Sequence, residues 1–304
     1  MTSQTIFASG LENGEIKVWD FDLDFLLYTL RGHTGAVLNL EYLSNNFLAS
    51  GDENGYIFIW NLLKRTKVTE LIHDRYVRSI ILIDSTTFAS AASNSIKLWW
   101  IDSFTNRLSI QNAHSSDIIG LRYFSNRLFS ISTDGILKSW ENFNYKFQIN
   151  VNCEVLSFEL ISNGNLVCGC TNNLIKIYSA GLDSFSFIRS IGQISDVSSL
   201  SVLESEFLVS GDTDGRLNIW NPNTGLKLMS FFGHNSKVNT LENIKNKTFL
   251  SGSDAGNIKA WNMDNGNKLR QYFVDSTVCF LKYFDRKFNL ISTLKNSHII
   301  FKLI

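Results

Sequence analysis

The chain has 304 residues, of which 44% are hydrophobic, and its 28 basic and 28 acidic side chains give a formal net charge of zero. A nucleic-acid-binding protein would carry a basic excess, so we expect no nucleic-acid partner. The sequence contains neither an apolar run of the roughly 18 residues that a membrane helix needs nor a secretion signal after Met1. We therefore expect an intracellular protein without membrane insertion.

Taken in chain order, the predicted elements are short strands that come in pairs. Residues 6–10 form an apolar strand that ends in glycine, and residues 16–20 alternate with the period of two that is typical of a strand. The same pair recurs at residues 47–60, 207–221 and 249–261. In each pair a polar turn separates the apolar strand from a strand that carries tryptophan at or near its end.

Aromatic residues mark the end of each unit at intervals of 38 to 42 residues, by subtraction of their numbers. These landmarks are Trp19, Trp60, Trp99, Trp140, Tyr178, Trp220 and Trp261, and Phe301 follows 40 residues later. A period of about 40 residues with four strands per unit indicates the blades of a β-propeller. Since no blade buries its own apolar faces, we expect one domain over residues 1–304.

The repeated residues resemble those of the WD40-repeat family. Gly32-His33 and Gly233-His234 match its Gly-His signature, and Trp19-Asp20 matches its Trp-Asp signature. The resemblance covers essentially the whole chain, because seven landmarks are in register. It implies an all-β propeller of four-stranded antiparallel blades.

The number of blades stays open between seven and eight. If the strands of a blade are lettered a to d from the axis outward, seven stretches read as strand a but eight read as a b–c pair. The N-terminal hairpin could lie outside a seven-bladed ring, or an eight-bladed ring could lack one inner strand. A third alternative is a fragment whose upstream part held the N-terminal closing strands.

In this family a histidine ahead of strand a, a strand-b serine, an Asp of the b–c turn and the strand-c tryptophan form a hydrogen-bonded set. The resemblance implies this structural role for His33 and Trp60, for His114, Asp134 and Trp140, for Asp214 and Trp220, and for His234 and Trp261. The serine beside His114 is Ser130 or Ser132. The first set has Asn54 at the Asp position, so the set around His114 is predicted to be the most complete.

The unit that ends at Tyr178 departs furthest from the family pattern. It has Asn172 for the aspartate and no histidine near Cys153. Cys168 and Cys170 are two residues apart on one strand and so share a face. We interpret the cysteines as small buried hydrophobes, with a disulfide or metal pair as the alternative.

The same polar set recurs around the ring, whereas an active site is a single constellation, so we expect no enzyme, no catalytic residues, no metal site and no cofactor. In the family the face with the d–a and b–c loops is the usual docking surface, and the residue ahead of strand a points from its inner rim. Those positions are Ala36, Tyr76, Asp117, Glu154, Asp196, Lys237 and Thr277.

Two groups of rim residues are candidates for partner binding. Asp117, Glu154 and Asp196 lie on consecutive blades, and we expect this acidic arc to accept a basic segment of a partner protein. Tyr76, with Arg75 and Arg78, forms an aromatic and basic group of the kind enriched in binding hot spots. Lys237 follows the arc on the next blade. Ordinary solvated loop acids are the alternative for the arc, and packing against Val77 and the adjacent loop is the alternative for Tyr76.

The leading function hypothesis is a non-enzymatic scaffold that binds a protein or peptide on the loop face. A substrate-recognition propeller of a ubiquitin ligase is the more specific alternative, which the eight b–c pairs favour. A propeller enzyme with its site at the axis is the contrary class.

Overall fold

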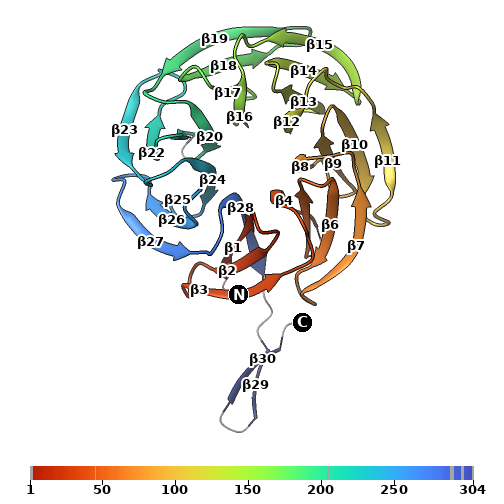
Figure 1. Ribbon diagram of the computed structural model, residues 1–304, viewed down its shortest axis with the longest axis vertical. Helices are drawn as coiled ribbons and strands as arrows, with labels where there is room; N and C mark the ends of the chain where they lie inside the picture. The colour runs from red at the N-terminus through yellow and green to blue at the C-terminus, as the bar shows by residue number, and fades with distance from the viewer. Residues whose placement is uncertain (1–2, 45, 204–205, 288–290, 296–297, 303–304) are drawn as a thin grey trace.

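The computed structural model describes residues 3–44, 46–203, 206–287, 291–295 and 298–302. These residues form strands and turns, and none of them belongs to a helix of membrane-spanning length. Seven sheets of four antiparallel strands stand around one axis, with one strand of each sheet at the centre and one at the periphery (Figure 1). The all-β propeller that the repeats predict is confirmed, with seven blades.

We number the blades from the first complete one in the sequence and give their strands from the axis outward. Blade 1 consists of β4 (Val37–Tyr42), β5 (Phe47–Asp52), β6 (Tyr56–Asn61) and β7 (Thr66–Ile72). Blade 2 consists of β8 (Val77–Leu82), β9 (Thr87–Ala92), β10 (Ser95–Trp100) and β11 (Asn106–Ile110). Blade 3 consists of β12 (Ile118–Phe124), β13 (Arg127–Ser132), β14 (Ile136–Glu141) and β15 (Asn144–Asn150).

Blades 4 to 6 repeat this order. Blade 4 consists of β16 (Val155–Leu160), β17 (Leu166–Cys170), β18 (Leu174–Ala180) and β19 (Phe185–Gly192). Blade 5 consists of β20 (Val197–Val202), β21 (Leu208–Asp212), β22 (Arg216–Trp220) and β23 (Lys227–Phe232). Blade 6 consists of β24 (Val238–Ile244), β25 (Thr248–Ser253), β26 (Asn257–Asn262) and β27 (Lys268–Phe273).

Blade 7 closes the ring with strands from both ends of the chain. Its inner strand is β28 (Val278–Lys287), and β1 (Ser3–Leu11), β2 (Ile16–Asp20) and β3 (Phe25–Leu30) follow outward. β1 pairs with β28 in antiparallel fashion from Ser3 opposite Lys287 to Leu11 opposite Val278. This ladder leaves neither strand with a free edge at the seam.

The surplus b–c pair is the C-terminal one. β29 (Ile291–Lys295) and β30 (His298–Lys302) form a two-stranded sheet that projects away from the ring (Figure 1). The eight-bladed alternative is therefore wrong for the described residues, and so is the alternative that puts the N-terminal hairpin outside the ring. β1 takes the place beside β28 because it pairs along nearly the whole length of that strand.

The apolar core lies between neighbouring blades, because each sheet is buried on both faces. The cluster between blades 4 and 5, for example, joins Val167 and Ile175 to Val197 and Trp220. Glycine on strand b lets the next blade approach closely: a Cβ on Gly211 would lie 2.6 Å from Val238 Cγ1. The glycine on strand b of the repeat is thus a packing requirement of the ring.

Candidate docking face and axial channel

The residues ahead of the inner strands are fixed to the b–c turns of their own blades. The main-chain carbonyls of Asp117, Glu154 and Asp196 accept N–H groups from Thr133 (2.9 Å), Thr171 (3.1 Å) and Thr213 (3.2 Å). Ala36, Lys237 and Thr277 accept equivalent bonds from Glu53, Asp254 and Glu12. The backbone of the rim is therefore held rigidly, which suits a surface that carries side chains to a partner.

The three acids of the predicted arc lie on blades 3, 4 and 5. Glu154 is exposed, and Asp117 and Asp196 are half-buried. In the described part of the chain their carboxylates make no hydrogen bond or ion pair, so their charges face solvent. Lys237 on blade 6 is also exposed and ends the arc with the opposite charge.

The face as a whole is far more acidic than the neutral net charge suggests. Every blade places at least one acid in its d–a loop or b–c turn: Glu12, Glu15, Glu53, Asp74, Asp117, Asp134, Glu154, Asp196, Asp214, Asp254 and Asp275. The basic residues in the same loops are Arg31, Arg75 and Lys237. A surface with this imbalance attracts cationic groups over a distance set by the ionic strength.

Tyr76 stands on blade 2 with two guanidinium groups next to its ring. The Cζ atoms of Arg75 and Arg78 lie 5.1 and 5.3 Å from the centre of its ring. Tyr76 is half-buried and has a φ of 51°, and its N–H is bonded to the carbonyl of Glu53 on blade 1. The structure thus brings the three predicted residues together at the mouth of the axial channel, which Arg78 also lines.

A serine on strand b is the centre of the polar set in several blades. In blade 3, Ser130 Oγ lies 2.7 Å from His114 Nε2 and 2.8 Å from Trp140 Nε1. In blade 6, Ser251 Oγ joins His234 and Trp261 at 2.6 and 2.8 Å. Burial lowers the pKa of His114 to about 4 and that of His234 to about 3, so both rings are neutral at pH 7.

The complete set, with a carboxylate, is in blade 1 and not in blade 3. His33 Nδ1 lies 2.9 Å from Asp52, and Ser50 Oγ joins His33 Nε2 (2.6 Å) to Trp60 Nε1 (2.7 Å). Asp52 is the last residue of β5, two positions before Asn54. The sequence comparison therefore expected the carboxylate two residues too late.

Blades 3 and 5 show why the later position does not reach the ring. Asp134 accepts hydrogen bonds from Ser115 and Ser132 instead of from His114, whose Nδ1 is buried without a partner. Asp214 accepts a bond from Ser195 in the same way. Both carboxylates thus accept hydrogen bonds from serines on the loop face and not from the residue at the histidine position.

In blade 5 a glutamine occupies the histidine position. Gln193 Oε1 accepts a bond from Ser210 Oγ (2.8 Å), which in turn lies 2.9 Å from Trp220 Nε1. Asp212 ends β21 as Asp52 ends β5, but its Oδ2 is buried without a partner. Burial raises the pKa of this carboxyl group.

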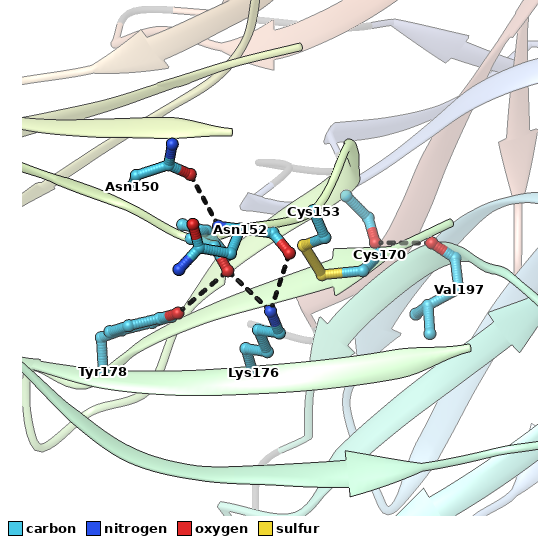
Figure 2. The surroundings of a disulfide bond; sticks show 9 residues. Asn150, Asn152, Cys153, Cys170, Lys176, Tyr178 and Val197 are labelled. Atoms are coloured by element: carbon cyan, nitrogen blue, oxygen red, sulfur yellow. Dashed lines mark hydrogen bonds between the residues drawn. A yellow bond between two sulfur atoms is a disulfide. The ribbon is translucent and has the colours of Figure 1, made fainter. Parts of the chain in front are cut away.

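Two cysteines of blade 4 are joined by a disulfide, contrary to our interpretation of Cys168 and Cys170 as small buried hydrophobes. Cys153 in the d–a loop forms a disulfide with Cys170 at the end of β17, with a Cα–Cα distance of 5.8 Å (Figure 2). Cys168 is a buried free thiol, and burial raises its pKa to about 12. The two-residue spacing of Cys168 and Cys170 suggested the wrong pair. The partner of Cys170 is Cys153, which precedes strand a, and strand a pairs with the strand b that carries Cys170.

Charged side chains line the axial channel at one level of the inner strands. The channel is a cavity of about 850 Å³. Lys282 Nζ lies 2.7 Å from Glu41, and Arg122 forms an ion pair with Glu159. Glu242 accepts the N–H of Tyr283 (2.9 Å), and desolvation in the channel raises the pKa of its carboxyl group to about 7 although Lys282 opposes this shift.

The ion pairs hold neighbouring blades together, since each joins two adjacent inner strands. Within the part of the chain that the structure describes, no group of three His, Cys, Asp or Glu side chains is arranged to hold a metal ion. These four ion-paired side chains of the channel are thus engaged with one another across the blade seams.

Similarity to known proteins agrees with this geometry. The model of the WD domain, G-beta repeat, matches residues 25–61 and 225–262. The crystal structure of the computationally designed Ika8 protein aligns with a TM-score of 0.72 at 24% identity, over 99% of this chain and 91% of that chain, which shows the fold.

Three curated relatives share parts of the sequence. The DENN domain and WD repeat-containing protein SCD1 of Arabidopsis thaliana is 25% identical over 47% of this chain. The p21-activated protein kinase-interacting protein 1-like of Danio rerio is 24% identical over 68%, and the WD repeat and SOCS box-containing protein 1 of Takifugu rubripes is 30% identical over 34%.

The matches cover 12%, 57% and 25% of these three relatives, respectively, so the chain spans only part of their lengths. The names of two of them include the WD repeat. With two repeats matched by the family model and seven four-stranded blades around one axis, the chain belongs to the WD40-repeat family.

Proposed function

We propose that this chain is a non-enzymatic interaction scaffold that binds a basic, extended segment of a partner protein on its loop face. The observation that carries the proposal is the arc of Asp117, Glu154 and Asp196, whose main chains are fixed and whose carboxylates have no partner in the described residues. WD40 propellers generally act as protein-binding scaffolds without catalytic activity, which supports this reading.

The acidic surroundings of the arc strengthen the proposal. A lysine- or arginine-rich segment laid across blades 3 to 5 would meet a new carboxylate on each blade. Tyr76, Arg75 and Arg78 on blade 2 would then contact an acidic or apolar residue at one end of the segment, and Lys237 an acidic residue at the other. In this proposal residues 1–304 work as one domain inside the cell and bind no nucleic acid.

A labelled decalysine peptide tests the arc directly by fluorescence anisotropy at low salt. Reversal of Asp117, Glu154 and Asp196 to lysine should weaken binding about 10- to 100-fold, at roughly 0.5–1 kcal/mol for each lost contact. The matched control reverses the exposed acids Asp102, Asp183 and Asp264, which lie in c–d loops, and should change affinity less than about threefold. Equal losses in the two triple variants would end the proposal.

A partner segment can be sought with the same variants. Affinity capture from the source cell should recover a partner with the wild type and with the c–d loop variant but not with the arc variant. Tyr76→Ala should reduce capture separately, because a stacked aromatic residue is a frequent hot spot.

The substrate-recognition role in a ubiquitin ligase is the second candidate. The similarity to a WD repeat and SOCS box-containing protein supports it as a candidate. The eighth b–c pair, however, no longer favours it, since that pair forms β29 and β30 outside the ring. Capture of ligase subunits together with the partner would support this role.

A further inference from the structure

Blade 4 has a hydrophobic residue where most of the other complete blades have a histidine. Val151 donates its N–H to the carbonyl of Gly135 in the preceding blade (2.8 Å), as His234 donates to Gly215 (2.9 Å). The two residues therefore occupy the same position of the repeat. A valine side chain cannot bond to strand b, so blade 4 lacks the polar link that the histidine provides.

Cysteines occupy the other polar positions of the same blade. Cys170 pairs with Val155 as Asp52 pairs with Val37, so it stands at the carboxylate position. Cys168, two residues earlier, stands at the serine position. In blade 1 the His33–Asp52 bond ties the d–a loop to the end of strand b, and in blade 4 the Cys153–Cys170 disulfide makes this tie covalently.

The tied loop carries the central residue of the acidic arc. Glu154 follows Cys153 directly, and its carbonyl accepts the N–H of Thr171, the neighbour of Cys170. On the other side of the loop, Lys176 Nζ donates to the carbonyls of Val151 (2.7 Å) and Asn152 (3.1 Å) (Figure 2). The disulfide thus lies between the part of the loop that lysine holds and the part that faces a partner.

The two cysteine residues differ in their exposure. Cys153 is half-buried on the loop face, whereas Cys170 is fully buried, as is the free thiol of Cys168. A small thiol can therefore approach the disulfide from the side of Cys153. Disulfides reached from solvent are the ones that exchange with a thiol pool.

We propose that Cys153 and Cys170 form a reversible thiol–disulfide site that fixes or releases the Glu154 loop. The thiolate of a low-molecular-mass thiol such as glutathione attacks Cys153 Sγ, the Sγ–Sγ bond breaks, and Cys170 leaves as a thiolate that takes up a proton. A second thiolate attacks the sulfur of the bound small thiol, which releases Cys153 and a small disulfide. Two electrons pass from the two small thiols to the protein, and the reverse reaction restores the bond.

Thiol counting tests the site itself. The full chain is equilibrated in glutathione buffers of different redox ratio, quenched in acid, denatured and alkylated with a maleimide, and its mass is measured. We expect two labels at the oxidised end, on Cys168 and Cys279, and four at the reduced end. The same number of labels at every ratio, whether two or four, would overturn the proposal.

Amide hydrogen exchange tests the effect on the loop. On reduction the Thr171 amide should exchange about tenfold faster, because its acceptor is on the released loop. Thr133 and Thr213 are matched controls, since their amides bond to Asp117 and Asp196 on blades that have no disulfide. An unchanged rate at Thr171 would show that the disulfide does not hold the loop.

The variant Cys153→Ser keeps this test informative. The substitution is at the half-buried loop residue and prevents the disulfide from forming. The Thr171 amide of this variant should therefore exchange at the rate of the reduced wild type in every buffer. A redox response at Thr171 that persists in this variant would assign the effect to another group and refute the proposal.

The consequence for binding rests on the proposed function. Decalysine should bind the reduced protein about threefold more weakly than the oxidised protein, because a mobile Glu154 must be ordered on binding. If decalysine binds neither form, the proposed function fails while the thiol count and the exchange rates still decide the redox site. If it binds both forms equally, the coupling of the site to docking is refuted.

Discussion

Replacement of Ser130 by alanine should destabilise the ring far more than the loss of one hydroxyl group suggests. Ser130 Oγ is shared by His114 Nε2 and Trp140 Nε1, and all three side chains are buried. The substitution leaves two buried polar groups without a partner, each at a cost of about 1–3 kcal/mol. The expected loss in the free energy of unfolding is therefore about 2–6 kcal/mol.

Ser139 provides a control in the same blade. It is also completely buried, but its Oγ has no hydrogen-bond partner, so Ser139→Ala should change the free energy of unfolding by less than about 1 kcal/mol. Urea unfolding followed by tryptophan fluorescence measures both variants, and an unchanged slope shows that the same surface is exposed. Equal destabilisation by the two substitutions would refute the reasoning.

Two further changes test the channel and the ring closure. Because the pKa of Glu242 is raised to about 7 in the folded protein, its contribution to stability is present below about pH 4.5 and is lost as the pH rises to about 7. We therefore expect Glu242→Gln to gain stability relative to the wild type when the pH is raised from 5 to 8, as measured by the free energy of unfolding in urea. A difference in free energy between the two proteins that does not vary with pH would contradict this. Removal of residues 288–304 should leave the unfolding midpoint unchanged, since β28 pairs with β1. Removal of residues 278–304 should instead abolish cooperative unfolding, and similar effects of the two truncations would disprove this closure.

The repeat made the fold predictable, because the period of the aromatic landmarks counts units without any knowledge of their contacts. Ring closure was not predictable in the same way. β1 and β29 both have the pattern of a strand b, and the choice between them depends on pairing between the two ends of the chain. Local sequence does not report which pairing is longer.

The polar sets were located correctly at the histidine and tryptophan positions but not at the carboxylate. Asp52 reaches His33 because it ends strand b opposite the first residue of strand a. The spacing of acids within the turn does not show this register. Three residues, Asp52, Asp212 and Cys170, occupy the same position at the end of strand b in their repeats. A comparison of the strand ends would have identified this position as that of the carboxylate.

The charge of the loop face was hidden by the neutral composition. Acids such as Glu53, Asp134 and Asp254 lie in the loops of this face, whereas most of the bases lie in strands. Sorting the loops by the face on which a propeller places them would have revealed the imbalance. The disulfide, by contrast, depends on a register that only the folded blade displays.

The pairing of β1 with β28 determines the number of blades and thus the position of every rim residue. Amide–amide nuclear Overhauser effects in a deuterated sample measure this pairing without altering the protein. We expect cross-peaks between residues 6–10 and residues 280–284, as in the pair of Ala8 and Lys282. Cross-peaks from residues 280–284 to residues 291–295 in their place would show that β28 pairs with the C-terminal hairpin and would contradict the seven-bladed ring.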